Sequence, residues 1–260
     1  MATVLRAVRV CAAYKPKMGH GAKAGLSLKD FQRLYGADPF YKWFGLDNPL
    51  MYAAHKAAGG MTSVYRQIGI ACESLFRTIL QDELGLSEEE SNWSYSVTTS
   101  GKKQRRLSLD ARIPLDRVGP AASRKRVAEW IRHVSRELDV EPKVARALQG
   151  AVFEVRQGYK SKDSKRQNAD LANAATAYTQ AYLPCVLLMS SQIDSDIVTR
   201  YRHEKWAILS GEPRAGNPCS STYDFMRDVI GYDLAAFFER HAESLQTEMA
   251  GILEALLRTE

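Results

Sequence analysis

The sequence predicts an α/β fold of the α+β-like kind, in which helices flank a central mixed sheet. Apolar residues recur at helical intervals over Thr62–Leu84 and Ser123–Val140, which indicates two amphipathic helices. Ala151–Met189 has the pattern strand, alanine-rich helix and fully apolar strand, which is typical of a crossover onto a covered sheet. The chain has 260 residues, 45% of them hydrophobic, with no repeat or convincing linker, so a single domain over residues 1–260 is expected.

The N-terminal third is predicted to be mostly helical. Ser27 can cap a short helix that ends at Gly36. Pro49 suits the first turn of a second helix, which the Gly59–Gly60 pair is expected to end. The longest amphipathic helix should then run over Thr62–Leu84.

A two-residue alternation follows these helices and predicts a hairpin. Trp93–Val97 alternate apolar with small polar residues, and residues 99–102 form a plausible turn. Apolar and polar residues alternate again from Leu107 to Pro114, with Asp110 on the polar side. The Ser123–Val140 helix comes next.

The C-terminal half continues the mixed pattern. A strand is expected over Ala151–Tyr159, a helix over Asn168–Tyr182 and a buried strand over Leu183–Met189. Further helices are expected over Asp194–Ile208, Ser221–Asp228 and Leu234–Leu257.

Composition narrows the classes of function. The apolar stretches are too short to span a bilayer and the N-terminus lacks a signal-peptide pattern, so no membrane partner and a cytoplasmic location are expected. The four cysteines are scattered, with no histidine at zinc-ligand spacing, which favours reduced thiols over disulfides or structural zinc. The glycine-rich motifs of nucleotide binding and the nucleophile elbow of hydrolases are both missing.

The distribution of charge is uneven along the chain. Gly101–Arg166 contains 18 Lys or Arg and 8 Asp or Glu, a local excess of +10, whereas Ser221–Glu260 has an excess of −5. A basic middle section suggests a surface that binds a polyanion such as DNA. The alternative is a solvated basic face without a ligand.

Two acidic residues stand between apolar neighbours on predicted strands, Asp110 and Glu154. If the strands are adjacent, the carboxylates converge, repel each other and need a cation, for which Mg²⁺ is suited because it prefers oxygen ligands. Glu154 and Arg156 share one face of their strand, so a guanidinium would lie beside the metal ligand. The alternative for each acid is a salt bridge at a strand end, and Glu73, on the long helix, could simply face solvent.

Two basic segments could contact phosphates. Residues 160–166 hold four basic side chains and lead into Gln167 and Asn168 at a helix start. Phosphates bind readily at such a position, and these amides could pair with adenine. The second segment is the predicted turn Lys102–Arg106, in which four of five residues are basic. The predicted DNA-binding residues are Lys102, Lys103, Arg105, Arg106, Lys160, Lys162, Lys165, Arg166, Gln167 and Asn168.

The order of these elements resembles the PD-(D/E)XK nuclease core. The stretch Phe153–Asp170 (FEVRQGYKSKDSKRQNAD) is similar to the catalytic strand and following segment of type II restriction endonucleases. The resemblance covers about residues 61–191 and leaves helical additions over 1–60 and 192–260. It implies a restriction-endonuclease-like core, Mg²⁺-dependent hydrolysis of double-stranded DNA at a short target, and a homodimer.

Carried over, the resemblance makes Asp110 and Glu154 the metal-binding acids and Glu73 the helix acid that some members add. Three departures matter: Leu109 replaces the proline before the aspartate, the Ser123–Val140 helix is an insertion, and Arg156 stands at the motif lysine. Arginine stays protonated and cannot act as a base. Lys160, further along the same face, could take the lysine's place if the strand continues.

Two other functions remain open from the sequence. One is a non-catalytic DNA-binding or regulatory protein that uses the basic middle section without cutting. The other is a repair or recombination nuclease on the same core, which differs in substrate rather than chemistry.

Overall fold

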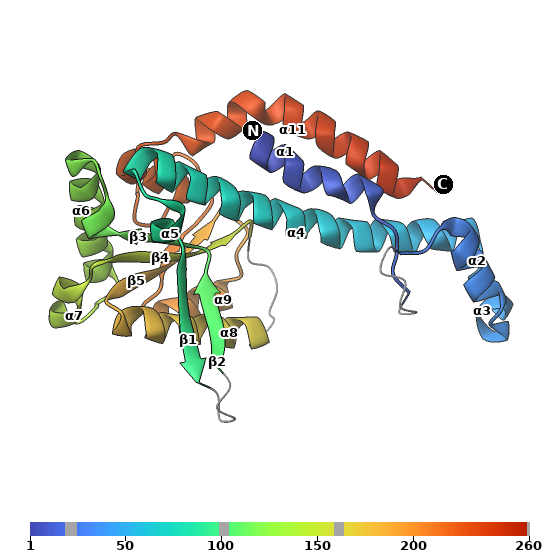
Figure 1. Ribbon diagram of the computed structural model, residues 1–260, viewed down its shortest axis with the longest axis horizontal. Helices are drawn as coiled ribbons and strands as arrows, with labels where there is room; N and C mark the ends of the chain where they lie inside the picture. Colours follow the sequence, from blue (N-terminus) through green and yellow to red (C-terminus); the bar gives the residue numbers. More distant parts are fainter. Residues whose placement is uncertain (19–24, 99–103, 159–163, 259–260) are drawn as a thin grey trace. The chain divides into compact units, whose positions relative to one another are not determined.

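The computed structural model describes residues 1–18, 25–98, 104–158 and 164–258. The chain packs as two compact units, the first made of Met1–Ala71 with Arg240–Glu260 and the second of Cys72–Glu239 (Figure 1). The predicted fold class is confirmed, because helices surround a mixed four-stranded sheet. The single-domain organisation stays a prediction, which limited proteolysis would test.

The first unit is helical. It contains α1 (Ala2–Arg9), η1 (Val10–Ala13), α2 (Leu28–Gly36), α3 (Pro39–Trp43), the N-terminal part of α4 (Pro49–Leu84) and most of α11 (Leu234–Leu257). The Ser27 hydroxyl accepts a hydrogen bond from the Asp30 amide, which confirms the predicted cap of α2. The small core of α1, α4 and α11 is formed by Val8, Cys11, Val64, Ile252 and Leu256.

The predicted end of a helix at Gly59–Gly60 is wrong, because α4 runs without a break from Pro49 to Leu84. A side chain at Gly59 would collide with the Tyr14 ring, and one at Gly60 with Leu256. The glycines therefore allow close packing in mid-helix rather than ending the helix. The predicted C-terminal end at Leu84 is confirmed, and Gly85, with a φ of 68°, follows the last helical residue.

The second unit is built on the sheet β3-β4-β5-β6, formed by β3 (Ala111–Pro114), β4 (Gly150–Arg156), β5 (Tyr182–Leu188) and β6 (Ala207–Leu209). Strand β3 is antiparallel to β4, while β4, β5 and β6 are parallel. The predicted crossover is confirmed, because α8 (Ser164–Thr179) connects the parallel strands β4 and β5.

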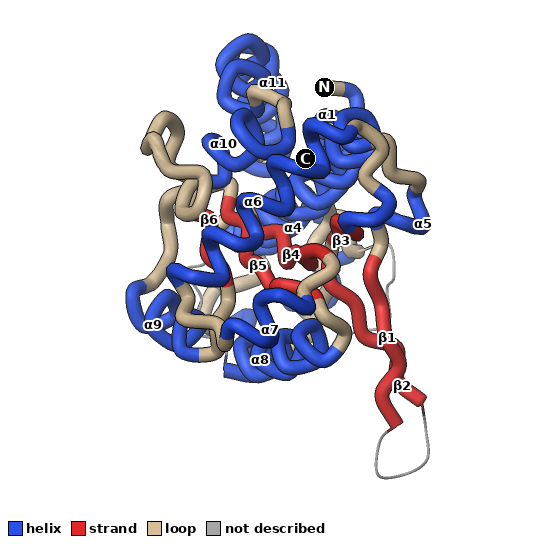
Figure 2. The backbone as a smooth tube through the Cα atoms, turned by 90° about the vertical axis from the view of Figure 1, so that its left-hand side faces the viewer, coloured by secondary structure: helices blue, strands red, loops and turns tan. Residues whose placement is uncertain are grey.

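Residues of β4 alternate between the two faces of the sheet, which are covered by different helices (Figure 2). On one face, the Phe153 ring contacts Phe76 of α4, Trp130 of α6 (Ala121–Glu137) and Phe225 of η3 (Phe225–Ile230). On the other face, Val152 packs with residues of α8 and α9 (Ser195–His203). Glu154 and Arg156 share this second face, since they alternate with Phe153.

The predicted hairpin is confirmed as β1 (Trp93–Thr98) paired with β2 (Gln104–Leu109), and it forms a separate two-stranded sheet. The predicted continuous alternation from Leu107 to Pro114 is interrupted at Asp110, where the chain passes from β2 to β3. The Asp110 amide donates to the Phe153 carbonyl oxygen at 2.8 Å. The interruption therefore fixes Asp110 beside β4.

Further elements differ from the prediction in their bounds. The strand expected over Ala151–Tyr159 ends at Arg156, and the helix expected over Asn168–Tyr182 runs over Ser164–Thr179 instead. The helix expected over Asp194–Ile208 ends at His203, and Lys205 turns the chain with a φ of 60° so that Ile208 lies in β6. The remaining elements are α5 (Glu88–Ser91), η2 (Leu115–Arg117), α7 (Pro142–Ala147) and α10 (Thr222–Asp224). Within the described residues, we find no helix whose length and apolar character would let it cross a membrane.

Gly150→Ala is expected to destabilise the second unit by about 2 kcal/mol, because the new methyl group would overlap the backbone carbonyl oxygen of Ile113 in the paired strand β3. Gly119→Ala is the control, since a methyl group there would make an ordinary contact, 3.6 Å from the Leu84 carbonyl oxygen. Urea unfolding followed by tryptophan fluorescence measures both. Equal stability of the two variants would contradict the expected clash.

Candidate active site

Asp110 and Glu154 lie beside each other across the β3–β4 pair. The antiparallel register aligns Ala111 with Phe153. Asp110, just before Ala111, therefore lies opposite Glu154, just after Phe153. The Asp110 carboxylate accepts a hydrogen bond from the Val155 amide at 2.8 Å. The backbone of β4 thus holds the Asp110 side chain in place, next to Glu154.

Arg156 links Glu154 to a second buried acid. Its guanidinium lies 2.6 Å from Glu154 Oε1 and 3.2 Å from Asp170 Oδ2, and both carboxylate side chains are almost fully buried. The Tyr201 hydroxyl donates to the same Asp170 oxygen at 2.5 Å. The prediction that Glu154 and Arg156 share a face is confirmed, and their side chains form an ion pair.

Sequence reasoning gave Asp170 and Tyr201 no role. Asp170 is 4% exposed and lies on the face of α8 that also buries Asn173, Ala174 and Ala177. The available signal was that Asp170 lies at helical spacing from Ala174 and Ala177, on the face of the helix expected to be buried. A buried carboxylate requires a partner, so this spacing could have indicated an ion pair. The partner, Arg156, lies on a strand 14 positions earlier in the sequence.

Glu73 lies in α4, one turn before Arg77. The Arg77 guanidinium donates to the backbone carbonyl oxygen of Asp110 at 2.8 Å, which ties α4 to the chain between β2 and β3. Burial, and then the negative charge of Asp110, raise the pKa of Glu73 to about 7, although Arg77 and Arg156 oppose this shift. Glu73 is therefore electrostatically part of the same site rather than only a solvent-facing acid.

The pKa values of Asp110 and Glu154 are also raised. Burial raises the pKa of Asp110, while the Val155 amide and the two arginines lower it. Burial, and then Asp110, raise the pKa of Glu154 well above its usual range, although Arg156 opposes this. Three neighbouring acids with raised pKa values are the arrangement that an added cation would stabilise.

The donor set fits Mg²⁺ chemically, because Glu73, Asp110 and Glu154 offer only hard oxygen ligands. One oxygen of Asp110 and one of Glu154 already accept hydrogen bonds from protein groups. Among the described residues, the three acids do not bring ligand atoms all within 4.8 Å of one another. Binding by all three would need side-chain movement, whereas binding through one or two acids and several waters is the usual manner of Mg²⁺.

The predicted DNA-binding residues are only partly described. Lys102, Lys103, Lys160 and Lys162 lie outside the described residues. The suggested role of Lys160 stays a prediction, but the strand on which it depended does not continue, because β4 ends at Arg156. For the rest, the structure places the backbone but not the side chains: Arg105 and Arg106 belong to β2, and Lys165, Arg166, Gln167 and Asn168 belong to the start of α8.

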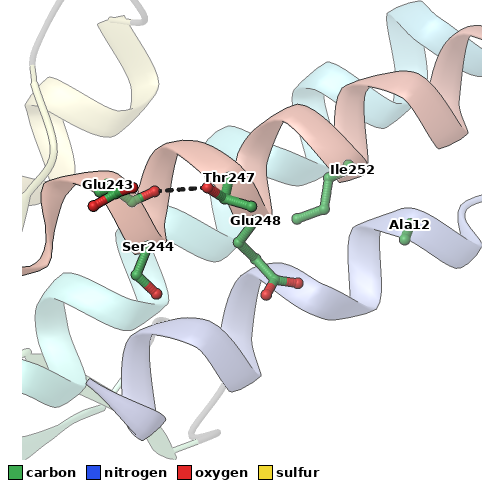
Figure 3. A pocket seen from close by; sticks show the side chains of 7 residues that line it. Ala12, Glu243, Ser244, Thr247, Glu248 and Ile252 are labelled. Carbon is green, nitrogen blue, oxygen red and sulfur yellow. Dashed lines mark hydrogen bonds between the residues drawn. The ribbon is translucent and has the colours of Figure 1, made fainter.

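A hollow of about 530 Å³ in the first unit lies between the N-terminal segment and α11 (Figure 3). Its polar side chains have local partners: the Thr247 hydroxyl donates to the Glu243 carbonyl oxygen, and Glu248 forms an ion pair with Arg9. The acids of the second unit remain the stronger candidate site, because burial and mutual repulsion perturb them together.

Comparison with known proteins gives no relative: the models of protein families, the curated proteins and the solved structures each yield no match.

The raised pKa of Glu73 predicts a loss of stability as the pH rises. The folded protein holds the Glu73 proton up to about pH 7 and the unfolded chain only up to about 4.5, so folding is favoured by protonation between these values. Without Mg²⁺, ionisation of Glu73 should cost on the order of 1 kcal/mol after solvent screening is allowed for.

The measurement is urea unfolding from pH 4.5 to 8 in a chelating buffer, for the wild type and Glu73→Gln. The free energy of unfolding of the wild type should fall relative to that of the variant as the pH rises. Added Mg²⁺ at pH 8 should reduce this difference in stability. A difference that stays constant with pH would contradict the prediction.

Proposed function

We propose that this chain is a Mg²⁺-dependent endonuclease that hydrolyses phosphodiester bonds of double-stranded DNA at a specific sequence, like a type II restriction endonuclease. The observation that carries the proposal is the placement of Asp110 and Glu154 on adjacent strands, with raised pKa values and with Arg156 beside them. The basic segments near both strands in the sequence support it, because they could hold the DNA backbone.

Each residue has a distinct part in the proposed reaction. Asp110 and Glu154 would hold Mg²⁺, with Glu73 as a third acid at the edge of the site. The bound ion would activate a water molecule and stabilise the charge that develops on the phosphate. Arg156 remains protonated, so it would stabilise negative charge rather than accept a proton.

The proposal includes two properties of the whole protein. A homodimer would allow two copies of the site to cut both strands of a palindromic target. A cytoplasmic location would place the enzyme where it meets DNA. Sedimentation of the protein with and without DNA tests the first of these.

One observation favours a DNA-binding protein without catalysis. The Arg156 guanidinium lies 2.6 Å from Glu154 and also contacts Asp170, so a fixed cation already compensates part of the acidic charge. In that case the acids and Arg156 would stabilise the fold and the basic segments would still bind DNA.

The first experiment is incubation of the purified chain with plasmid and phage DNA in Mg²⁺ or in excess chelator, followed by gel electrophoresis. Discrete Mg²⁺-dependent fragments would support the proposal, and sequencing their ends would give the target. A smear, or cleavage only at ends and junctions, would favour a repair or recombination nuclease. Salt-sensitive binding without cleavage of several unmodified DNAs would favour the non-catalytic protein.

A further inference from the structure

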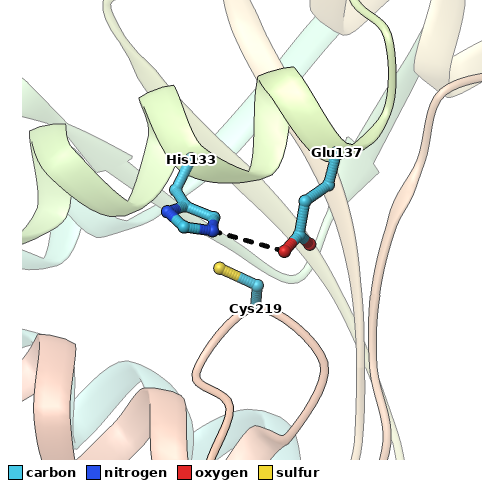
Figure 4. A group of neighbouring side chains, drawn as sticks. All are labelled: His133, Glu137 and Cys219. Carbon is cyan, nitrogen blue, oxygen red and sulfur yellow. Dashed lines mark ion pairs between the residues drawn. The ribbon is translucent and has the colours of Figure 1, made fainter.

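A second group of metal-ligating side chains lies in the second unit, on elements that the candidate active site does not use (Figure 4). His133 and Glu137 are one turn apart on α6, and Cys219 lies on the segment between β6 and α10. Their ligand atoms all lie within 4.8 Å of one another. The cysteine is 82 positions from the nearest of the other two ligands in the sequence, so no spacing motif indicates the group.

The distances suit a small tetrahedral ion. His133 Nε2 and Glu137 Oε1 are 3.4 Å apart. With zinc bonds of about 2.0–2.2 Å to nitrogen and oxygen, the edge of a tetrahedron between two such ligands measures roughly 3.3–3.5 Å. The thiol of Cys219 lies within 4.8 Å of both partner atoms. A shift on the order of 1 Å would bring the sulfur to a zinc bond length of about 2.3 Å.

Two hydrogen bonds at Asn217 and Pro218, the residues just before Cys219, hold this segment in position. The Trp130 indole of α6 donates to the Pro218 carbonyl oxygen at 2.9 Å, and the Asn217 side chain accepts from the Cys219 amide at 2.8 Å. Helix α6 therefore carries two of the ligands and also anchors the segment that supplies the third. A site formed in this way needs little reorganisation on binding an ion.

The surroundings leave space for a fourth ligand. Glu137 and Cys219 both line a hollow of about 380 Å³. Arg202 and Lys205, which also line it, would repel a bare cation. The two negative charges of a carboxylate and a thiolate neutralise a divalent ion at the site itself, and a water molecule can complete the coordination.

Burial, and then Glu137, raise the pKa of the Cys219 thiol to about 11, so the thiol is protonated at neutral pH. This argues against a role as a nucleophile. An arriving divalent ion would replace the thiol proton: the S–H bond breaks, the metal–sulfur bond forms and the proton passes to solvent.

We propose that His133, Glu137 and Cys219 bind a divalent ion of zinc type, which links the last turn of α6 to the segment between β6 and α10. Nitrogen, oxygen and sulfur together select such an ion over Mg²⁺, which prefers oxygen alone. The site is chemically distinct from the three acids, and the proposal does not depend on nuclease activity.

The test is a titration of the full chain, without an affinity tag, with Co²⁺ under a non-thiol reductant and excess Mg²⁺. A thiolate-to-Co²⁺ charge-transfer band and tetrahedral d–d bands are expected, and Zn²⁺ should remove both. The acids Glu73, Asp110 and Glu154 contain no sulfur, so Co²⁺ bound there cannot produce the charge-transfer band. His133→Ala and Glu137→Gln should each weaken Co²⁺ binding by roughly 10–100-fold, and Cys219→Ser should abolish the charge-transfer band.

Glu129→Gln is the matched control, because Glu129 is an exposed acid on the same helix that pairs with Lys125. It should leave the Co²⁺ affinity unchanged. His133 and Glu137 are exposed, so their substitution should preserve the fold, and circular dichroism checks this. The proposal is overturned if the wild type gives no charge-transfer band, if the band persists in Cys219→Ser, or if Glu129→Gln weakens binding as much as Glu137→Gln does.

Discussion

Asp110→Asn should reduce Mg²⁺-dependent DNA cleavage by on the order of 10³-fold or more, while DNA binding and the fold are retained. The amide keeps the shape of the side chain, and its oxygen can still accept the hydrogen bond from Val155. What it loses is the negative charge that would hold the ion. Because that charge is partly buried and lies beside Glu154, its removal should also relieve repulsion in the metal-free protein.

Cleavage rates under single-turnover conditions measure this effect, and a filter-binding assay in Ca²⁺ measures DNA affinity separately. Asp116→Asn is a suitable control, since Asp116 is an exposed acid a few residues further along the chain. An Asp110→Asn variant that cleaves at the wild-type rate would remove Asp110 from the site. If the wild type binds DNA without cutting it, unchanged or tighter binding by Asp110→Asn would favour the non-catalytic protein.

Asp170→Ala should destabilise the second unit by about 3 kcal/mol, because it removes one partner of a buried ion pair and leaves the remaining groups poorly compensated. Arg156 would keep its ion pair with Glu154 but lose the carboxylate 3.2 Å away. The Tyr201 hydroxyl would lose its short hydrogen bond to the same carboxylate. If Arg156 acts in the reaction, its altered position should also lower cleavage by roughly 10–100-fold, as loss of a supporting contact does at metal sites.

Equilibrium unfolding in urea measures the change in stability, with Tyr201→Phe as the comparison. That variant removes one hydroxyl donor and keeps the ring, so a smaller loss of about 1 kcal/mol is expected. An Asp170→Ala variant as stable as the wild type would show that the Arg156–Asp170 contact contributes little to folding. A loss of stability with full cleavage activity would limit Asp170 to a structural part.

The sequence alone predicted the elements whose signals are local. The periodicity of α6, the cap at Ser27 and the extent of α11 all depend on residues within a few positions of one another. The crossover of β4, α8 and β5 was also predictable, since a fully apolar strand after a helix must be covered on both faces. The alternation in β4 placed Glu154 and Arg156 on one face, and their ion pair follows from that spacing.

Only the tertiary structure decided the features that depend on distant residues. Gly59 and Gly60 remain inside α4 because Tyr14 and Leu256 pack closely against them. The strand pattern is interrupted at Asp110, between β2 and β3, because the backbone of β4 supplies hydrogen-bond partners for both the amide and the carboxylate of Asp110. The approach of Cys219 to α6 is likewise a long-range contact. Neither segment has a sequence pattern that predicts its contact with the other. Nearby residues determine the periodicity and the caps of each helix or strand. Packing and charge compensation across the whole fold determine which other elements that helix or strand contacts.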